Sequence, residues 1–585
     1  MRTTMRAAVA SLLVVHALLL AWLASVHSPL IDEPAHLASG LCHWRTFSFD
    51  LYRVNPPLVR AVAAVPLLTS RQAANWDAHS SNPYSRAEFS AGKALFETND
   101  KAGRYLFAGR LLCIPFCILG GLVCFLWGNE LFGRPAGLTA LVLWSFSPMI
   151  LAFGHTILPD VAAAAMGLSS CYVFWKWLKF PTPQRTFVAG AVLGVAELTK
   201  FTLLMLYPIF LTLWGIKVVA VRRAATEKDR PSFRLLLRLM LVSLLTINLG
   251  YGFEGSFVPL KDYEFISRTL CGDTKWNHET GFTLTGNRFR NHIVGATPVP
   301  LPYNYVTGID VQKYDFEIGR NSYFMGEWSR KGWISYYVVG LFFKTPLAVT
   351  ALGALSVCAF AASKKYRADL VSETALAAPI VTILCLASLQ TKMNEHLRYA
   401  IPVLPFLFIG ISRAAASAPN SSRALKGVTM TLVLLAALSS LLQLPHSAAY
   451  LNELVCAPGH SRAFTDKDPP PLLGSNIDWG QNLYFLQKWH DENQDKEPLY
   501  IDYAPGLPPE RLGMQFVPPP MKRAAGYYAI GINELFGADG RHKDFQPRRP
   551  ERLIANSIYI YRLTQEDVDA APPKKAEEAQ GVAKE

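Results

Sequence analysis

Long stretches of apolar residues constrain the fold of this chain more than any other feature of its sequence. A helix that crosses a lipid bilayer needs about 20 apolar residues, and runs such as 203–221 and 429–444 approach this length with almost no charge. Charged residues make up only 17% of the chain, below the usual share of about 25% in soluble domains. The sequence therefore predicts a protein that spans a membrane several times.

The whole chain is predicted to contain about eleven membrane-spanning segments. The first is expected to be an uncleaved helix, because its apolar stretch exceeds the roughly 7–15 residues of a signal peptide. The fifth is shorter than a full span and is expected to be broken or re-entrant. The segments are expected near 7–26, 106–128, 136–153, 161–178, 187–198, 201–221, 235–252, 334–361, 374–390, 399–412 and 427–444.

Basic residues predict the orientation of these segments, because cytoplasmic loops are enriched in Lys and Arg. Arg2 and Arg6 place the N-terminus inside. Alternation from there gives inner loops that all carry basic residues, at 134, 176–185, 222–230, 364–367 and 413–426. The outer segments are then 27–105, 154–160, 253–333 and the chain after about 445. We predict a multi-pass protein of a bacterial inner membrane whose C-terminal region is extracytoplasmic.

The net charge of +13 is compatible at first sight with nucleic-acid binding. A nucleic-acid binder, however, gathers its basic residues with aromatic residues on one folded face. Here the basic residues are scattered between the predicted spans. The lipid bilayer is therefore the expected partner, and no nucleic acid is expected.

The chain is predicted to divide into a membrane domain at 1–445, an extracytoplasmic α/β domain at 446–563 and a disordered tail at 564–585. In the α/β domain, the apolar positions between Leu483 and Trp489 follow a helical spacing, and strand-like runs lie at 499–503, 526–532 and 554–563. The tail is rich in Ala, Lys and Glu, a composition typical of disorder.

Three acidic residues stand at predicted outer ends of spans. Asp32 and Glu33 follow the first span, and Asp160 begins the fourth. A partly desolvated carboxylate at a membrane surface can act as a general base, which typically contributes about 10² to 10⁴ in rate. The alternative is a structural role, because an acid at a helix start is also a common helix cap. Their location at one face makes them candidate catalytic residues.

Five cationic residues are expected near the same outer face, against the bias toward basic cytoplasmic loops. Placing a cation at the centre of a span costs about 2.5–3.5 kcal/mol on insertion scales, so an anionic partner such as a lipid phosphate is predicted. The alternative is that some of these side chains extend to ordinary lipid headgroups. The candidate phosphate-binding residues are Arg110, Lys200, Lys344, His396 and Arg398.

The order of these motifs resembles the superfamily of protein O-mannosyltransferases and lipid A aminoarabinose transferases. The resemblance covers roughly residues 7–445, and the segment from Ser475 to Gln481 is similar to one in the tail domain of some bacterial members. It implies the fold of the C-type glycosyltransferases (GT-C), an all-α polytopic membrane protein, here followed by the small α/β domain. The shared elements are Asp32-Glu33, Asn55-Pro56-Pro57-Leu58, Arg110, Asp160, Lys200, Lys344-Thr345-Pro346 and Arg398-Tyr399.

The resemblance implies a glycosyltransferase that moves a hexosyl or pentosyl unit from a polyprenyl-phosphate carrier to an acceptor hydroxyl at the outer face. Asp32 is the implied base, with inversion at the anomeric carbon, and the acceptor is a lipid, a glycan or a protein. No cofactor is expected, although a divalent metal stays an open alternative because some C-type enzymes use one. The sequence carries no Walker A loop and no Rossmann glycine pattern, in keeping with a donor that is not a nucleotide sugar.

Two other functional classes compete with this hypothesis. A transporter or flippase of lipid-linked saccharides would also have many spans and intramembrane cations, but it is expected to show repeat symmetry and acids near mid-membrane. Neither feature is evident in the sequence. A non-catalytic membrane anchor for the C-terminal domain would leave the outer-face acids unexplained. A glycosyltransferase is therefore the leading hypothesis.

Overall fold

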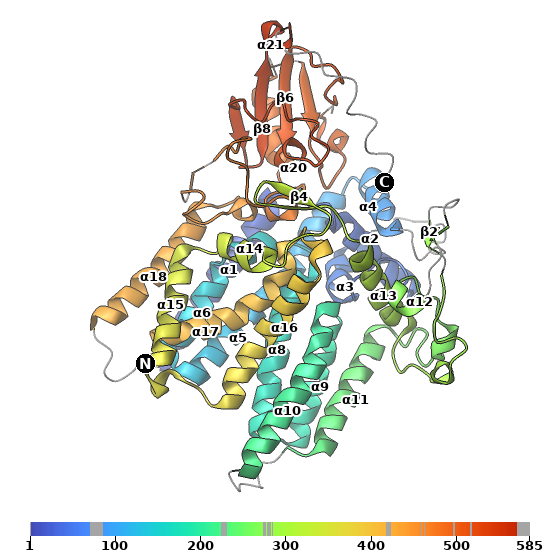
Figure 1. Ribbon diagram of the computed structural model, residues 1–585, viewed down its shortest axis with the longest axis vertical. Coiled ribbons are helices and arrows are strands. Elements are labelled where there is room, and N and C mark those ends of the chain that lie inside the picture. The colour runs from blue at the N-terminus through green and yellow to red at the C-terminus, as the bar shows by residue number, and fades with distance from the viewer. Residues whose placement is uncertain are drawn as a thin grey trace.

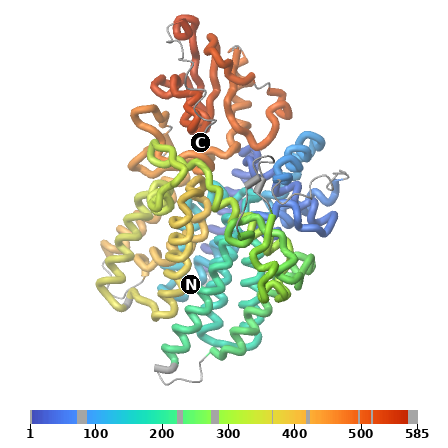
Figure 2. Tube along the Cα trace, turned by 45° about the vertical axis from the view of Figure 1, so that its right-hand side comes forward, coloured from blue at the N-terminus to red at the C-terminus, as the bar shows by residue number. Residues whose placement is uncertain are grey.

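The fold is a large helical bundle that carries a small β-sheet at one end, as the computed structural model shows (Figure 1). Figure 2, turned by 45°, shows the C-terminal region again at that end. The structure describes residues 2–70, 86–223, 231–272, 276–277, 282–283, 285–416, 423–457, 459–460, 462–494, 496, 498–514 and 517–569.

Within these residues, seven helical segments are long and apolar enough to cross a membrane. A pair of helices, α14 (Tyr336–Phe343) and α15 (Leu347–Ala362), adds an eighth if it forms one bent span. The chain is thus a mostly helical, multi-pass membrane protein. The seven segments are α1 (Arg2–Val26), α5 (Ala102–Phe132), Phe201–Val221 in η3 and α10 (Leu206–Arg223), α11 (Phe233–Gly250), α16 (Leu370–Leu389), Leu397–Ala415 around α17 (Leu404–Ser412), and α18 (Arg423–Leu442).

The predicted count of eleven spans is not confirmed. The third, fourth and fifth predicted segments do form helices, but these do not meet the same criteria of length and hydropathy. The predicted single span at 334–361 is two helices bent by 114°. Pro346 lies at this bend, where its ring and its missing N–H prevent the helix from continuing. The helices at the third to fifth segments are α6 (Arg134–Ser145), α7 (Pro148–Phe153), α8 (Pro159–Lys179) and α9 (Pro183–Glu197).

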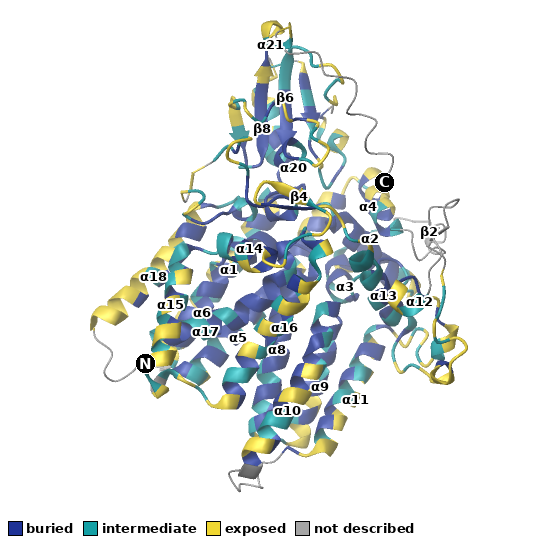
Figure 3. Ribbon diagram, in the orientation of Figure 1, coloured by how far each residue is buried: buried dark blue, intermediate teal, exposed yellow. Residues whose placement is uncertain are grey.

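The outward faces of the bundle are apolar, and its interior is closely packed. On α11, Leu237, Leu241 and Leu245 are each about half exposed, whereas Leu236 and Leu239 are buried. Figure 3 shows exposed positions on the outer turns of α9, α10, α11 and α18. An exposed stripe of leucines on a long helix is stable next to lipid chains but not next to water.

The C-terminal region contains helices and a small β-sheet. It contains α19 (Leu483–Glu492), α20 (Ile532–Leu535) and a four-stranded sheet of order β5-β6-β8-β7. β5 (Leu499–Asp502) pairs in parallel with β6 (Gly526–Gly531), and β6 pairs antiparallel with β8 (Ile558–Leu563), Gly526 lying opposite Leu563. The third predicted strand is a hairpin, because β7 (Arg552–Ile554) turns back into β8 through Ala555 and Asn556, both with positive φ. The expected tail at 564–585 begins with a short helix, α21 (Gln565–Asp569), and the rest lies outside the described residues.

Short helices and two hairpins extend from the bundle. These connecting elements all belong to the segments 27–105 and 253–333 and are α2 (Glu33–Thr46), α3 (Leu58–Ala64), α4 (Ala87–Thr98), α12 (Arg268–Cys271), α13 (Tyr303–Ile318), β1 (Trp276–Asn277), β2 (Phe282–Thr283), β3 (Ser322–Phe324) and β4 (Glu327–Ser329). The hairpin of β4 lies next to the sheet in Figure 1, whereas α12, α13 and β2 lie at the right-hand side of the bundle. The C-terminal end of α10 and the N-terminal end of α18 lie away from the sheet (Figure 1), and the orientation of the bundle in the membrane stays a prediction.

Candidate active site

A cavity of about 290 Å³ lies where the bundle meets these connecting elements. It brings together five of the eight residues selected from the sequence, which are Asp32, Asp160, Lys200, His396 and Arg398. They come from loops and helix starts that are far apart in the chain. The other lining residues are Ile31, His36, Tyr52, Val54, Asn55, Arg86, Phe89, Leu158, Pro159, Gln312, Asp315, Arg320, Met393, Tyr399 and Trp479.

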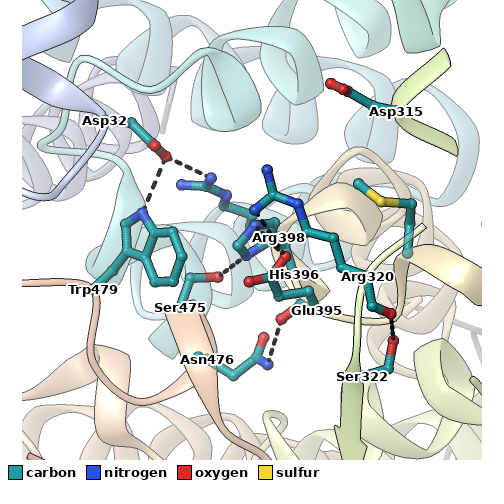
Figure 4. Close-up of polar contacts among 12 residues, drawn as sticks. Asp32, Asp315, Arg320, Ser322, Glu395, His396, Arg398, Ser475, Asn476 and Trp479 are labelled. Carbon is teal, nitrogen blue, oxygen red and sulfur yellow. Dashed lines mark hydrogen bonds and ion pairs between the residues drawn. The ribbon is translucent and has the colours of Figure 1, made fainter. Parts of the chain in front are cut away.

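The two cavity acids that were predicted are both paired with cations. Arg398 Nη2 donates a hydrogen bond to Asp32 Oδ2 at 2.7 Å (Figure 4). Lys200 Nζ donates to Asp160 Oδ1, and Arg398 Nε lies 3.9 Å from Asp160 Oδ2. Arg398 therefore lies between the two carboxylates, and the four side chains form one buried charge network. Trp479 Nε1 also donates to Asp32, at 3.2 Å.

The two cavity acids both lie at the start of a helix. Asp32 occupies the N-cap position of α2, but its side chain makes no capping hydrogen bond. Asp160 lies in the first turn of α8, whose N-cap residue is Leu158. Asp32 therefore makes no helix-capping hydrogen bond, and Asp160 does not occupy the cap position. Pro34 and Pro159 start the two helices, and a proline suits a first turn because it has no N–H to satisfy there.

Arg398 has hydrogen-bonding capacity that the described residues do not use. Its side chain is 8% exposed, and its Nε and Nη1 atoms have no hydrogen-bond partner among the described residues. A buried guanidinium nitrogen without a partner is costly, so an external acceptor at this point would be stabilising. The cavity is lined by four Lys or Arg side chains and three Asp side chains. An anionic ligand such as a phosphate fits this balance.

His396 lines the cavity, but it does not supply the positive charge that was predicted for it. Burial, with a smaller contribution from Arg398, holds the pKa of the His396 ring well below its ordinary value. The ring is therefore neutral at pH 7. Its Nδ1 atom lies 2.8 Å from Ser475 Oγ, and its ring packs edge-on against Trp479. His396 can hydrogen-bond a ligand, but only the Lys and Arg side chains can offset the charge of a phosphate.

Glu33 and Arg110 do not line the cavity, contrary to expectation. Both are buried and form an ion pair, with Arg110 Nε donating to Glu33 Oε1 at 3.0 Å. Arg110 also donates to the backbone carbonyls of Ala24, His27 and Ser28. Every nitrogen of the Arg110 guanidinium thus has a protein partner. The two residues thus form an ion pair that ties α5 to the end of α1 and the start of α2, and their predicted catalytic and phosphate-binding roles stay predictions.

Lys344 is also outside the candidate active site. Its side chain is 4% exposed, and its Nζ atom donates to the carbonyl oxygens of Ala448, Tyr450 and Asn476. An ammonium group has three hydrogens, so these three bonds use all of them. Lys344 thus joins the bend between α14 and α15 to the start of the C-terminal region, and its predicted phosphate contact stays a prediction.

Several cavity residues were not selected from the sequence. Arg86 donates to Glu88 at 2.6 Å and to Asp315 at 3.3 Å, and Arg320 Nη1 lies 3.5 Å from Glu395. These side chains lie in predicted outer segments that are polar, where a cation is common and does not by itself indicate a functional site. Trp479 belongs to a segment singled out for its resemblance alone, and its contact with Asp32 spans 447 positions of the chain.

Among the described residues, no group of three or more His, Cys, Asp or Glu side chains is placed to hold a metal ion. Asp32 and Asp160 have cations as their partners instead. A metal-free reaction stays an expectation from the sequence.

Residues 100–247 match the family model described as dolichyl-phosphate-mannose-protein mannosyltransferase. This segment resembles that family. The match runs from α5 into α11 and includes Arg110, Asp160 and Lys200. It confirms, for about a quarter of the chain, the resemblance that was read from the motifs.

Comparison with solved structures gives a more distant likeness. Two crystal structures of ArnT from Cupriavidus metallidurans, one bound to undecaprenyl phosphate and one in the apo state, match 75% of this chain at 13% identity. The matches cover 71% and 70% of the ArnT chains, with TM-scores of 0.40 and 0.39. A search of curated proteins gives no match.

Proposed function

We propose that this protein is a membrane glycosyltransferase that transfers a sugar from a polyprenyl-phosphate carrier to an acceptor hydroxyl. The observation that carries the proposal is the single cavity in which Asp32 lies beside Arg398 and Lys200. A general base and a site for a phosphate leaving group are the two parts that such a transfer needs. The name of the family matched by residues 100–247 supports a polyprenyl-phosphate sugar as the donor.

The proposed reaction is a single displacement at the anomeric carbon. The acceptor oxygen forms a bond to that carbon while the bond from carbon to the phosphate oxygen breaks, and its electron pair leaves with the polyprenyl phosphate. The acceptor proton passes to the carboxylate of Asp32. Because one nucleophile attacks opposite one leaving group, the configuration at the anomeric carbon is inverted.

Arg398 and Lys200 have the electrostatic role in this scheme. Negative charge grows on the departing phosphate in the transition state, so fixed cations lower the barrier more than they stabilise the bound sugar donor. The free Nε and Nη1 atoms of Arg398 can donate to two phosphate oxygens, the geometry in which guanidinium groups bind phosphate best. Asp160 holds Lys200 in place and keeps its charge balanced before the donor binds.

We further propose that the reaction takes place at the extracytoplasmic face. The cavity lies at the end of the bundle that carries the sheet, and the basic ends of the long helices lie at the other end. By the bias of basic residues toward the cytoplasm, the cavity end faces outward.

The direct test is transfer by purified, full-length protein in lipid nanodiscs. The substrates are a panel of labelled polyprenyl-phosphate sugars, with lipid, glycan and peptide acceptors, and the matched controls are the corresponding nucleotide sugars. We expect cleavage of at least one polyprenyl-phosphate sugar and none of the nucleotide sugars. Translocation of a lipid-linked saccharide without cleavage would contradict the proposal and would support the transporter alternative.

A further inference from the structure

A second cavity shares part of its wall with the candidate active site. Its volume is about 290 Å³, and both cavities include Ile31 and Trp479 in their walls. This volume is at the lower end of the range of about 300–1,000 Å³ that small-molecule sites occupy. Four parts of the chain build it, namely the loop after α1, the region of the β3 and β4 hairpin, the loop at 394–395 and the C-terminal region. Such junctions are common places for ligand sites.

The lining of this second cavity differs in chemistry from that of the first. No Lys, Arg or His side chain belongs to its described lining, whereas four Lys or Arg side chains line the first. Its walls combine aromatic rings with amides and carboxyl groups. The rings are Tyr323, Trp328, Trp479 and Tyr503, and the polar side chains are Asn321, Asn394, Glu395, Asp478, Asn533 and Glu534.

This combination fits a sugar ring. Aromatic faces pack against the apolar C–H groups of a pyranose, and amides and carboxyl groups exchange hydrogen bonds with its hydroxyls. A phosphate or carboxylate ligand would find no Lys, Arg or His side chain in the described lining to offset its charge. An uncharged, hydroxyl-rich ligand satisfies both halves of the lining.

Asn394 gives an independent indication that a ligand binds in this cavity. The residue is fully buried, and its Oδ1 atom accepts a hydrogen bond from the Trp333 backbone at 2.6 Å. Its Nδ2 atom has no hydrogen-bond partner among the described residues. Buried amide N–H groups are nearly always paired in folded proteins, because an unpaired one loses its hydration without compensation. A hydroxyl oxygen in the cavity would supply the missing acceptor.

The wall between the cavities places such a ligand close to the proposed base. Trp479 Nε1 donates to Asp32 (Figure 4), and the Trp479 residue also lines the second cavity. The turn that carries Trp479 is held against the Asp32 loop by two backbone bonds, Ile31 N to Trp479 O at 3.0 Å and Ser28 N to Gln481 O at 3.1 Å. The turn that lines both cavities is therefore tied to the loop that carries Asp32.

We propose that the second cavity binds the acceptor and that the acceptor is an uncharged saccharide. This inference rests on the proposed function and names the substrate class of that reaction. The C-terminal region then recognises the acceptor, while the bundle holds the sugar donor. The reacting hydroxyl reaches Asp32 past the edge of Trp479.

The test measures transfer by full-length protein in nanodiscs free of sugar detergents. A labelled polyprenyl-phosphate sugar is offered with three probes, which are a panel of neutral mono- and disaccharides, a peptide rich in Ser and Thr, and a phosphorylated lipid. The variants are Glu534→Ala and Asn321→Ala in the second cavity, with Glu534→Gln as the conservative change. The matched control is Glu510→Ala, an exposed acid of the same region that lies outside both cavities.

We expect transfer to at least one neutral saccharide. Glu534→Ala and Asn321→Ala should each raise the acceptor KM by about three- to tenfold, the effect of losing one hydrogen bond. Glu534→Gln should restore most of the loss, and Glu510→Ala should match the unchanged protein. Thermal melting of each variant separates an unfolded protein from one with a weakened site.

Two results would overturn the inference while leaving the proposed function standing. One is transfer to the peptide or the phosphorylated lipid but to no saccharide. The other is transfer to a saccharide with the same KM in folded cavity variants as in the control. Failure of the unchanged protein to cleave any polyprenyl-phosphate sugar would instead refute the proposed function itself.

Discussion

Arg398 holds Asp32 with one nitrogen and leaves two others available, so its replacement is expected to affect both the base and the phosphate. Arg398→Lys should be partly tolerated, because an ammonium keeps the charge but loses the paired geometry. Arg398→Ala should weaken binding of the sugar donor at least about tenfold, the effect of losing a charged hydrogen bond. It should also lower the single-turnover rate at saturating donor, because the charge on the phosphate grows as it leaves.

Donor affinity and single-turnover rate, measured separately, check this prediction. Lys392→Ala is the matched control, since Lys392 is an exposed cation close in sequence that does not line the cavity. Unchanged values of both quantities for Arg398→Ala would mean that Arg398 only anchors its helix, and Lys200 would become the phosphate-binding candidate.

The ionisation of Glu534 is predicted to make the stability of the folded protein depend on pH. Burial, assisted by the negative charges of Asp478 and Asp502, raises the pKa of Glu534 from its ordinary 4.5 to about 8 in the folded protein. Asp502 is itself paired with Arg541 and His542. The folded state then binds a proton that the unfolded state releases between these pH values. The stability contribution of Glu534 is fully present below pH 4.5 and is lost as the pH rises through 8.

Glu534→Gln removes this dependence because an amide does not ionise. We expect the variant to melt at a higher temperature than the unchanged protein at pH 8 and at a similar temperature at pH 4.5. Melting curves from tryptophan fluorescence at both pH values check this. A difference of the same size at both would show that Glu534 is ionised in the folded state.

Asp32 and Glu33 show what the sequence can and cannot predict about single residues. Both acids follow the first span, and the pattern that selected one selected the other. They differ only in the direction of the side chain at the start of α2, where Asp32 lines the cavity and Glu33 turns back to Arg110. That direction depends on packing against α5, which no local pattern records.

At the scale of elements, the buried pair of Glu33 and Arg110 joins α1, α2, α5 and the start of α8. Arg110 of α5 donates to carbonyls at the end of α1, and Glu33 of α2 accepts from the Ile157 backbone just before α8. Arg110→Ala should therefore destabilise the protein by roughly 3–5 kcal/mol, because it leaves a buried carboxylate without its cation. The thermal midpoint in detergent is the measurement, with the exposed Arg104→Ala on the same helix as control.

A double replacement separates this structural role from phosphate binding. Arg110→Met with Glu33→Leu removes both charges together and should recover much of the lost stability. If Arg110→Ala melted like the unchanged protein and lost only its affinity for the sugar donor, the original phosphate-binding role would be restored.

Elements with a strong local sequence pattern were predicted well, whereas the bend that divides one apolar run into two helices was not. The spacing of apolar residues predicted α19, and the strand-like runs predicted β5, β6 and β8. Lys344-Thr345-Pro346 was read as a phosphate-binding motif inside one span, but its proline bends the chain and its lysine bonds three carbonyls. A bend depends on the tertiary contacts that stabilise it, so hydropathy alone shows one apolar run.

For the whole molecule, the orientation in the membrane is the first prediction. Lys261, in an outer segment, should lie outside, and Lys364, at the opposite end, should lie inside. Each is replaced by Cys in a background without other reactive cysteines, and intact cells are treated with a membrane-impermeant thiol reagent. We expect labelling at 261 and none at 364 until the cells are opened. The reverse pattern would place the cavity in the cytoplasm and would contradict the site of reaction.

The assembly of the cavity from distant segments limits what the sequence predicts for the whole molecule. The sequence predicted that the selected residues lie at one face of the membrane, and five of them line this cavity. Arg86, Arg320 and Trp479 joined them only in the folded structure, since nothing in their local sequence indicates which outer segments meet. Trp479 shows this most clearly, because it contacts Asp32 from the opposite end of the chain.

The central claim is that Asp32 takes the acceptor proton in a transfer from a polyprenyl-phosphate sugar. Single-turnover transfer by Asp32→Asn tests it most directly, because the amide keeps the shape and the acceptor atom for Trp479 but cannot act as a base. Asp262→Asn, an exposed acid of another outer segment, is the control. We expect transfer to fall by about 10² to 10⁴ while the protein stays folded and binds the sugar donor. Transfer at a near-normal rate by folded Asp32→Asn would contradict the claim.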